Sequence, residues 1–447
     1  MQHRHLVLAS QSPRRRQILT ISGFEFDVLP SQISEIPDEN LNLSAKIRQL
    51  AADKARACLK MRTDSKGLGF LVLAADTVVV LDDQILGKPK DENEARLFLR
   101  RLSGRSHSVV TGVAMIDSST SIEFFGHAET TVRFRDLSPD EIETYVATKE
   151  PFDKAGGYGI QGAASHFIER LDGPYDNVVG LPMEIVEEGL RFFAENIAGF
   201  SIAKNSRVKE VGDQIRFFEQ ELKRHESSRT KRIAAKLIAV TKTKPATDVV
   251  MAWLAGQRVF GENYAQEAIE KKNDVELLVR SITPKPSGIQ WHFIGHLQSK
   301  KVKSVVGEFD LIHSVDRLSL AEEISKRAVA RGIEQAILLQ LNFADEKSKS
   351  GATPEEYIEL AKSVCGLPGI SLCGLMALPP LLDSEEETRT QFQEIVRVFE
   401  KTKASLPTEY ASQFKELSMG TTHDFRQALE AGATMVRIGT AIFGHRS

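Results

Sequence analysis

The stretch "LIAVTKTKP", residues 237–245, decides the fold of the second half of the chain. Its apolar and β-branched residues favour a buried strand, and Pro245 ends that strand because proline has no N–H for a neighbouring strand. Lys242 then lies at the carboxyl end of the strand, and Lys244 follows two residues later. Either both lysines are ordinary surface residues, or one is an amine whose pKa is lowered for chemistry.

Similar short apolar segments recur after this stretch, separated by longer segments with helical spacing of apolar residues. The predicted strands are KLIAVTKT, RVFGENY, IQWHFIG, LIHSVD, AILLQLN, SLCGLMAL, ELSMG and MVRIGTA. Eight β/α units over roughly 210 residues predict a closed parallel (β/α)8 barrel. An open doubly wound sheet is the alternative, but no Gly-rich first turn supports it.

The length of 447 residues predicts more than one domain. The segment "NIAGFSIAKN" (196–205) separates a helical pattern from a new amphipathic helix that begins near residue 206. We therefore expect an N-terminal domain at 1–197 and the barrel at 203–447. The N-terminal half mixes strands and helices without a regular order, which favours an α/β domain with a mixed sheet.

The composition excludes several classes of protein. A net charge of −3 argues against a protein that coats nucleic acid. Only three cysteines occur, at 58, 365 and 373, and none forms a C-x-x-C pair, which suits a reducing compartment. The first apolar run is too short for a signal peptide, and no segment reaches membrane-spanning length. A cytoplasmic protein without nucleic-acid or membrane partners is expected.

The N-terminal half contains the components of a phosphate site. In "LASQSPRRR" (8–16), Ser10 ends a predicted strand and Pro13 suits the first position of a helix, so hydroxyls, helix amides and arginines occur together. Asp76 follows the apolar run "FLVLAA", which predicts a carboxylate at a strand terminus. Lys88 and Lys154 lie in predicted loops. Basic groups and a carboxylate are what phosphoanhydride hydrolysis needs, although each one alone could be a surface charge.

Two other motifs fail their context. Gly157, Gly159 and Gly162 match G-x-G-x-x-G, but the preceding "EPFDKA" is not a buried strand, which argues against a dinucleotide site. His292 and His296 in "HFIGH" have the spacing of a zinc motif, but the glutamate is missing and the segment is a predicted strand. Both histidines are interpreted as structural or pocket residues.

The N-terminal segments together resemble the Maf family of nucleoside-triphosphate pyrophosphatases. The resemblance covers nearly all of residues 5–190, and its motifs are ASQSPRRRQIL, AADTVVV, GKP, LSGRSHSVVTGVAM, EPFDKAGGYGIQG and YDNVVGLPM. It implies hydrolysis of a nucleoside triphosphate to the monophosphate and pyrophosphate with Mg²⁺ or Mn²⁺, and a possible homodimer. Asp76 would be the proton acceptor and, with Glu35, a metal ligand. The residues implied to line the triphosphate site are Ser10, Arg14, Lys54, Lys88, Asp153 and Lys154.

Arg14, Thr77 and Gln161 resemble the dTTP/UTP subgroup of that family. A glutamine can both donate to and accept from a pyrimidine edge. The 7-methyl-GTP subgroup is expected to differ at these positions. The rival hypothesis for this half is a non-enzymatic nucleotide-binding regulator of division.

The C-terminal half combines an amine with a predicted phosphate cup. The strand "MVRIGTA" presents Arg437, Gly439 and Thr440 at its carboxyl end, and "ELSMG" adds Ser418. Active sites of barrels lie at this end, and phosphate often binds near strands seven and eight. An amine at the first strand and a phosphate cup across the barrel predict pyridoxal 5′-phosphate (PLP) held as a Schiff base.

The same half resembles the YggS/PROSC family of PLP-binding proteins, which shares its barrel with the N-terminal domain of alanine racemase. The matching motifs are AVTKTKP, FGENYAQEA, WHFIGHLQSKK, DEKSKSG, GLMAL, LSMG and MVRIGTAIFG. The resemblance assigns the cofactor amine to Lys242 and places Arg437 opposite the pyridine nitrogen. It implies that Asn263 and His292 line the pocket. Two departures from the family pattern occur: Lys300 stands where an asparagine is usual, and Thr421–Thr422 stand where Met-Ser is usual. Thr422 keeps a hydroxyl for the phosphate cup.

The resemblance implies PLP homeostasis rather than amino-acid chemistry. Arg437 stays cationic and would keep the pyridine nitrogen unprotonated, which makes the ring a poor electron sink. Racemases also use a tyrosine from a separate β-domain, and we expect none here because Ser447 follows closely on the last predicted strand. An active PLP-dependent racemase is the rival hypothesis.

Overall fold

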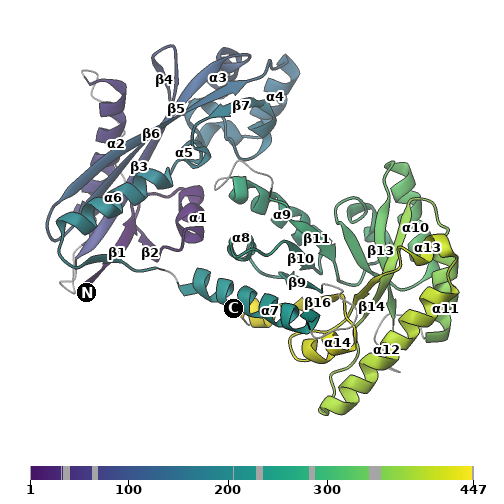
Figure 1. Cartoon of the computed structure of the whole chain (residues 1–447). Helices are drawn as coiled ribbons and strands as arrows, with labels where there is room; N and C mark the ends of the chain where they lie inside the picture. The colour runs from purple at the N-terminus through teal and green to yellow at the C-terminus, as the bar shows by residue number, and fades with distance from the viewer. Residues whose placement is uncertain are drawn as a thin grey trace. The chain divides into compact units, whose positions relative to one another are not determined.

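The computed structural model describes residues 2–31, 33, 41–62, 69–204, 206–227, 235–280, 287–341 and 354–444. The chain divides into two compact units, and each is described by itself below (Figure 1). The first unit comprises Met1–Ser206 with Leu277–Pro286. The second comprises Arg207–Glu276 with Ser287–Ser447.

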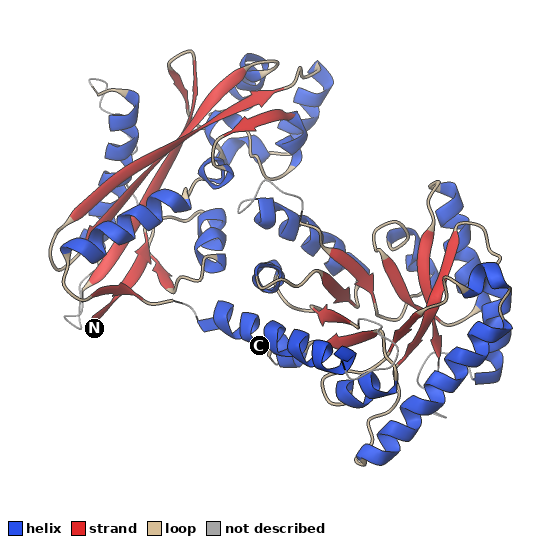
Figure 2. Ribbon diagram, viewed as in Figure 1, coloured by secondary structure: helices blue, strands red, loops and turns tan. Residues whose placement is uncertain are grey.

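The first unit is built on one mixed sheet of eight described strands (Figure 2). β1 pairs in parallel with β2, β3 and β8, whereas the pairs β3–β4, β3–β5, β5–β6 and β6–β7 are antiparallel. This confirms the predicted α/β domain with a mixed sheet. The strands are β1 (Gln2–Leu8), β2 (Phe26–Val28), β3 (Phe70–Leu81), β4 (Gln84–Leu86), β5 (Ser106–Asp117), β6 (Glu123–Phe134), β7 (Ile168–Asp172) and β8 (Phe200–Ile202).

Helices cover both faces of this sheet because successive residues of its central strands alternate between two cores. On β3, Leu71 and Leu73 belong to the core that also holds residues of α1 and α6. Val72 and Ala74 belong to the core formed with α2. The α-helices of the unit are α1 (Pro13–Ile21), α2 (Leu43–Met61), α3 (Glu92–Leu102), α4 (Pro139–Ala147), α5 (Tyr175–Val179) and α6 (Met183–Asn196).

A buried ion pair joins the start of β1 to the end of β5. Arg4 Nε donates to Asp117 Oδ2 over 2.8 Å, and the Asp117 side chain is fully buried. The other carboxylate oxygen accepts hydrogen bonds from the backbone N–H and hydroxyl groups of Ser119 and Thr120. Burial by itself raises the pKa of Asp117, but these hydrogen bonds outweigh it and the pKa is lowered.

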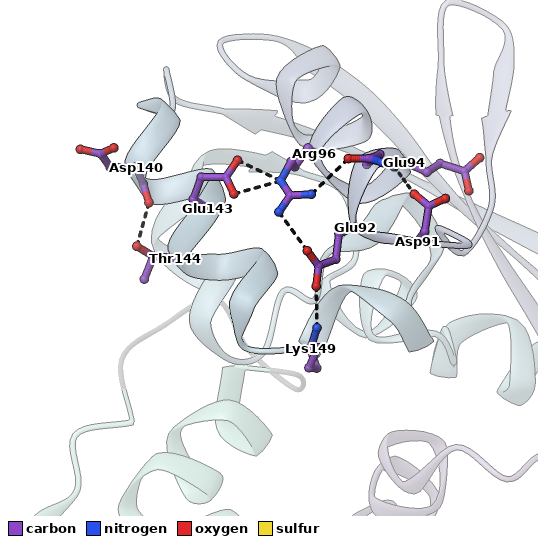
Figure 3. Close-up of polar contacts among 9 residues, drawn as sticks. Asp91, Glu92, Glu94, Arg96, Asp140, Glu143, Thr144 and Lys149 are labelled. Atoms are coloured by element: carbon purple, nitrogen blue, oxygen red, sulfur yellow. Dashed lines mark hydrogen bonds and ion pairs between the residues drawn. The ribbon is translucent and has the colours of Figure 1, made fainter.

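An exposed polar network links α3 to α4 and to the turn that follows α4 (Figure 3). Arg96 Nε lies 2.9 Å from both carboxylate oxygens of Glu143, and Arg96 Nη2 lies 3.0 Å from Glu92 Oε2. Lys149 Nζ donates to the other oxygen of Glu92 over 2.7 Å. These charges are solvated, so the buried residues beneath the two helices, among them Phe98 and Tyr145, contribute more to stability.

The second unit is a closed barrel of eight described parallel strands, in the order β10-β11-β12-β13-β14-β15-β16-β9. The sequence prediction of eight barrel strands is confirmed segment by segment. The strands are β9 (Lys236–Val240), β10 (Val259–Glu262), β11 (Gln290–Phe293), β12 (Leu311–Val315), β13 (Gln335–Leu341), β14 (Ile370–Ala377), β15 (Glu416–Ser418) and β16 (Met435–Ile438). Closure leaves no strand edge open, because β16 pairs with β9.

Helices surround the barrel and bury its outer side chains. The predicted helix at 206–228 is α7 (Ser206–Ser227), whose residues Val211, Ile215 and Phe218 are buried. The other α-helices are α8 (Ala246–Leu254), α9 (Ala265–Arg280), α10 (Leu318–Ala330), α11 (Pro354–Val364), α12 (Glu385–Ser405), α13 (Thr408–Ala411), α14 (Phe425–Ala431) and α15 (Thr440–Phe443). In the described part of the chain, no helix has the length and apolar content needed to cross a membrane.

The Arg4–Asp117 pair generates a stability prediction. Asp117→Asn is expected to reduce the stability of the first unit at pH 7 by about 3 kcal/mol, because Arg4 loses its buried counter-charge. The folded pKa of Asp117 is lowered, so its contribution is complete above its ordinary value of 3.8 and is lost as the pH falls through the lower folded pKa. Thermal unfolding of the full chain by calorimetry should therefore show a difference between variant and wild type that shrinks in acid.

Asp82→Asn is the matched control. Asp82 pairs with Arg105 over 2.6 Å, but both side chains are about half exposed, so the pair contributes at most about 1 kcal/mol. An equal loss of stability in the two variants would contradict the importance of the buried pair.

Candidate functional site

A cavity of about 600 Å³ lies in the first unit, where the end of β1, the start of α1, β3 and the segment 153–160 meet. It brings together most of the predicted phosphate-site residues. Those that line it are Ser10, Arg14, Lys54, Asp76, Thr77, Lys88, Asp153 and Lys154. Their convergence from segments far apart in the sequence is the geometry expected of a polyanion site.

The start of α1 is formed as its sequence predicts. Pro13 is the first helical residue, and the Ser12 side chain caps the helix by accepting from the Arg15 N–H. Ser10, in the turn before the cap, accepts from the Ser12 N–H over 3.2 Å. The cavity therefore has hydroxyl groups and arginines at one helix terminus.

Asp76 and Lys54 form a nearly buried ion pair in the cavity wall. Asp76 lies inside β3, which continues to Leu81, so the prediction that it ends a strand is wrong. The reason is that Val78 to Val80 pair with β5, which extends the strand beyond the apolar run. Alternation along β3 points Asp76 to the same face as Val72 and Ala74, which pack on α2, the helix that carries Lys54.

Asp153 and Lys154 also line this cavity, in a segment of short 3-10 turns. Lys154 Nζ donates to the Glu150 carbonyl over 2.8 Å and to Asp153 Oδ1 over 2.5 Å. Burial alone raises the pKa of Asp153, but the bond from Lys154 and the charges of Lys154 and Arg14 lower it overall. Arg14 therefore lies close enough to Asp153 for their charges to interact.

Arg15 is a site residue that the sequence reasoning missed. Its Nε donates to the Gly180 carbonyl over 2.7 Å, its Nη1 to Ser10 Oγ over 3.1 Å, and its Nη2 to Thr77 Oγ1 over 3.1 Å. The side chain thus ties together three separate segments of the cavity wall. It is the middle arginine of "PRRR", and nothing in the sequence distinguished it from Arg14.

Thr77 is engaged on two sides. It receives the hydrogen bond from Arg15, and its hydroxyl lies 3.0 Å from that of Thr111.

Two predicted residues of this site, Gln161 and Glu35, do not appear in the described cavity lining. Gln161 is half-buried but does not belong to the cavity lining, and Glu35 lies outside the described residues.

In the second unit, Lys242 lies two residues beyond the end of β9, at the carboxyl-terminal mouth of the barrel, and is half-buried. The inner face of β9 carries Ile238, which packs in the barrel core with Val259 and Met435. Lys242 itself lies in the turn that follows the strand. Arg437 and His292 lie on other strands of the same barrel.

A buried chain of hydrogen bonds crosses the barrel interior. Arg437 donates to Ser418 Oγ over 2.6 Å and to the Ala377 carbonyl over 2.9 Å. His313 Nδ1 lies 3.1 Å from Ser418 Oγ, and His313 Nε2 lies 3.0 Å from His292 Nδ1. The chain joins residues of five strands and includes His313, which the sequence reasoning missed.

Burial sets the charge states of the histidines and the arginine in this hydrogen-bonded network. It lowers the pKa of His292 to about 3, with a further contribution from Lys236, and it lowers the pKa of His313 well below its ordinary value. Burial also lowers the pKa of Arg437 to about 10, which still leaves the guanidinium charged at neutral pH. This part of the barrel interior therefore holds two neutral histidines and one cationic guanidinium.

The remaining predicted barrel residues lie at strand ends. Asn263 directly follows β10, and its Oδ1 is buried without a hydrogen-bond partner among the described residues. Gly439 directly follows β16, and a Cβ there would lie 3.2 Å from Val240 Cβ. Thr440 is exposed, so its hydroxyl is accessible to a ligand.

Comparisons with known proteins assign the two halves to different families. Residues 5–193 match the family of Maf-like proteins. The "dTTP/UTP pyrophosphatase" of Bdellovibrio bacteriovorus is 49% identical over 188 residues, which cover 42% of this chain and 98% of that protein. The protein of the same name from Moorella thermoacetica is 47% identical over 194 residues, 43% of this chain and 97% of that protein.

Residues 220–447 match the family of the alanine racemase N-terminal domain. The "Pyridoxal phosphate homeostasis protein" of Pasteurella multocida is 40% identical over 239 residues, which cover 54% of this chain and 96% of that protein. The solved structure of PipY from Synechococcus elongatus with PLP bound is 31% identical, covers 52% of this chain and all of that chain, and has a TM-score of 0.45. The chain therefore belongs to the Maf family through its first half and to the alanine racemase N-terminal domain family through its second half.

Proposed function

We propose that the chain is a bifunctional fusion. The first unit hydrolyses nucleoside triphosphates, with dTTP and UTP as preferred substrates, and the second unit binds PLP for PLP homeostasis. The observation that carries the first activity is the Lys54–Asp76 pair inside a cavity lined by further basic residues. The names of the relatives support both activities. The rival hypotheses, a non-enzymatic division regulator and an active racemase, are not favoured. The proposed domains are 1–197 and 203–447.

In the proposed hydrolysis, water supplies an oxygen to one of the two phosphorus atoms that flank the α–β bridge. The bridge bond breaks, pyrophosphate and the nucleoside monophosphate separate, and the water proton passes to Asp76. Arg14, Lys88 and Lys154 neutralise phosphate charge from different sides of the cavity. Arg15 holds Ser10 and Thr77 in place.

A divalent metal fits this set of residues. Among the described residues, no group of three His, Cys, Asp or Glu side chains is placed to hold a metal ion by itself. Mg²⁺, however, commonly uses one or two carboxylates together with substrate phosphates and water. Asp76 and Asp153 face the same cavity and would supply those carboxylates, and Glu35 remains a proposed third ligand. The ion would neutralise charge on the phosphates.

Asp76→Asn tests the first activity. The variant cannot take up the water proton, so pyrophosphate release from dTTP or UTP is expected to fall by about 10²-fold or more. Release is measured with Mg²⁺ and with Mn²⁺ over a panel of nucleoside triphosphates. Asp83→Asn, at an exposed turn between β3 and β4, is the control and should keep wild-type rates. A wild-type protein that releases no pyrophosphate from any nucleotide would rule out the proposed enzyme.

The barrel mouth fits PLP. Lys242 would hold the cofactor covalently through its amine, as a Schiff base with the aldehyde. Asn263 Oδ1, which is buried without a hydrogen-bond partner among the described residues, is a polar atom that a bound ligand would satisfy, and the exposed residue Thr440 beside Gly439 suits a phosphate. Ser418 is already bonded to Arg437 and His313, so any contact of its hydroxyl with phosphate would compete with those bonds.

Arg437 limits the chemistry that bound PLP can support. PLP supplies an electron sink when its ring nitrogen is protonated. A guanidinium that remains charged at neutral pH and is held by Ser418 and Ala377 offers only N–H donors and no proton acceptor. This supports cofactor binding rather than racemisation as the role of the second unit.

Lys242→Ala tests the second activity. The purified wild-type protein incubated with PLP should show a visible Schiff-base absorption band, and Lys242→Ala should abolish it. Lys244→Ala is the control, because Lys244 lies in the same turn but is not the proposed cofactor amine. A band that survives in Lys242→Ala and vanishes in Lys244→Ala would reassign the cofactor lysine.

Location and assembly belong to the same proposal. Both activities use metabolites of the cytoplasm, so we place the protein there. We also propose that any homodimer forms through the first unit, which sedimentation of the full chain can test.

A further inference from the structure

A charged cluster lies directly behind the turn that carries Lys242. It consists of Thr241, Glu262, Glu267 and Lys271, and is called the Lys271 cluster here. Lys271 Nζ donates to the Thr241 carbonyl over 2.7 Å, to Glu262 Oε1 over 2.7 Å and to Glu267 Oε1 over 2.8 Å. An ammonium group has three N–H donors, so these three acceptors saturate it.

The cluster is buried where it meets the barrel. Lys271 retains 6% of its side-chain exposure and Glu262 retains none. Glu262 follows Phe260 and Gly261 on β10, and Gly261 faces the inner residue Ile238, so alternation directs Glu262 outward to α9. Lys271 thus lies between strand and helix, outside the cofactor pocket. Burying the charge in such a place is costly, and the ion pairs and hydrogen bonds of Lys271 offset that cost.

Its bonds fix the backbone on both sides of Lys242. The Thr241 carbonyl, which accepts from Lys271, belongs to the peptide group before Lys242. The Thr243 N–H, which donates to Glu267 Oε1 over 2.6 Å, belongs to the peptide group after it. Peptide groups are planar, and only two torsions at Lys242 separate them. Holding both planes therefore sets the direction of the Lys242 Cα–Cβ bond.

The turn needs this support because its backbone is unfavourable. Thr243 has φ of 61°, in the left-handed region that a β-branched residue rarely adopts. Two hydrogen bonds hold the residues on either side of Lys242. The Thr243 N–H donates to Glu267, and Thr241 Oγ1 donates to Glu262 Oε1 over 2.7 Å. Since Glu267 and Glu262 are both bonded to Lys271, one ammonium links all the restraints.

We propose that Lys271, acting through Glu262 and Glu267, is a positioning residue that aims the Lys242 amine into the barrel mouth for its bond to the cofactor. This rests on the proposed PLP binding. Lys271 does not touch the cofactor. Its role is to hold Lys242 in the one orientation in which the amine reaches the aldehyde, so it contributes to covalent capture and not to non-covalent recognition.

The test compares two ligands on the full chain. PLP has the aldehyde, whereas pyridoxine 5′-phosphate has an alcohol there and cannot form a Schiff base. Lys271→Met should weaken PLP binding, followed by the Schiff-base band, by about tenfold or more, because a misdirected amine loses the covalent step. Binding of pyridoxine 5′-phosphate, followed by calorimetry, should change by less than about threefold.

A second variant covers the case in which Lys271→Met does not fold, since it leaves Glu262 buried without its counter-charge. Glu267→Ala removes the acceptor of the Thr243 N–H but keeps the Lys271–Glu262 pair, and it should show the same selective loss for PLP. Glu270→Ala is the control: this exposed residue of α9 contacts Gln266 and should bind both ligands as the wild type does.

The outcomes separate the two claims. Wild-type affinity for PLP in Glu267→Ala and in a folded Lys271→Met would overturn the positioning role and leave the proposed function intact. An equal loss for both ligands would also overturn it, because the pocket as a whole would then depend on the cluster. A wild-type protein without a Schiff-base band would overturn the proposed function and this inference with it.

Discussion

A buried charge is costly in a folded protein unless an opposite charge or hydrogen bonds compensate it, and both units contain an ion pair with little exposure at or beside their sites. Lys54 is paired with Asp76 in the wall of the first cavity. Lys271 is paired with the fully buried Glu262 behind the turn that carries Lys242, the proposed cofactor lysine. In each case the pair joins a helix to a strand, α2 to β3 and α9 to β10, so the interaction that makes burial possible also ties the two elements together beside a proposed site.

The barrel could be predicted from the sequence because its strands are short apolar runs with clear ends. The barrel strands of the described structure coincide with the eight predicted segments, and α1 begins at the proline that favoured a helix start. The mixed sheet of the first unit was predicted only from the irregular order of its strands and helices along the sequence. The length of β3 was not predicted, because it depends on the pairing of Val78 and Val79 with β5. Pairing between segments far apart in the chain cannot be recognised from the local sequence.

The site residues likewise include some that the sequence predicted and some that it did not. Residues in distinctive motifs, such as Asp76, Lys88 and Lys154, converge on one cavity. Arg15 was missed because the three consecutive arginines differ only in the direction that each side chain takes from the helix, and the sequence does not show this direction. His313 and Lys271 were missed for a different reason: each lies in an ordinary strand or helix pattern, and only the closed barrel brings its partners within hydrogen-bond distance. Polar residues inside regular elements acquire their roles from tertiary contacts.

The order of the barrel strands has a consequence for synthesis on the ribosome. β9 and β16 are the first and last strands of the barrel along the chain, yet they are hydrogen-bonded neighbours. The first unit has nearly all of its residues once position 206 has been made, and domains generally fold as units during synthesis. The barrel instead keeps an open edge at β9 until β16, the strand that carries Arg437, emerges and pairs with it. A nascent chain therefore passes through a stage in which the first unit has nearly all of its residues while the barrel is still open.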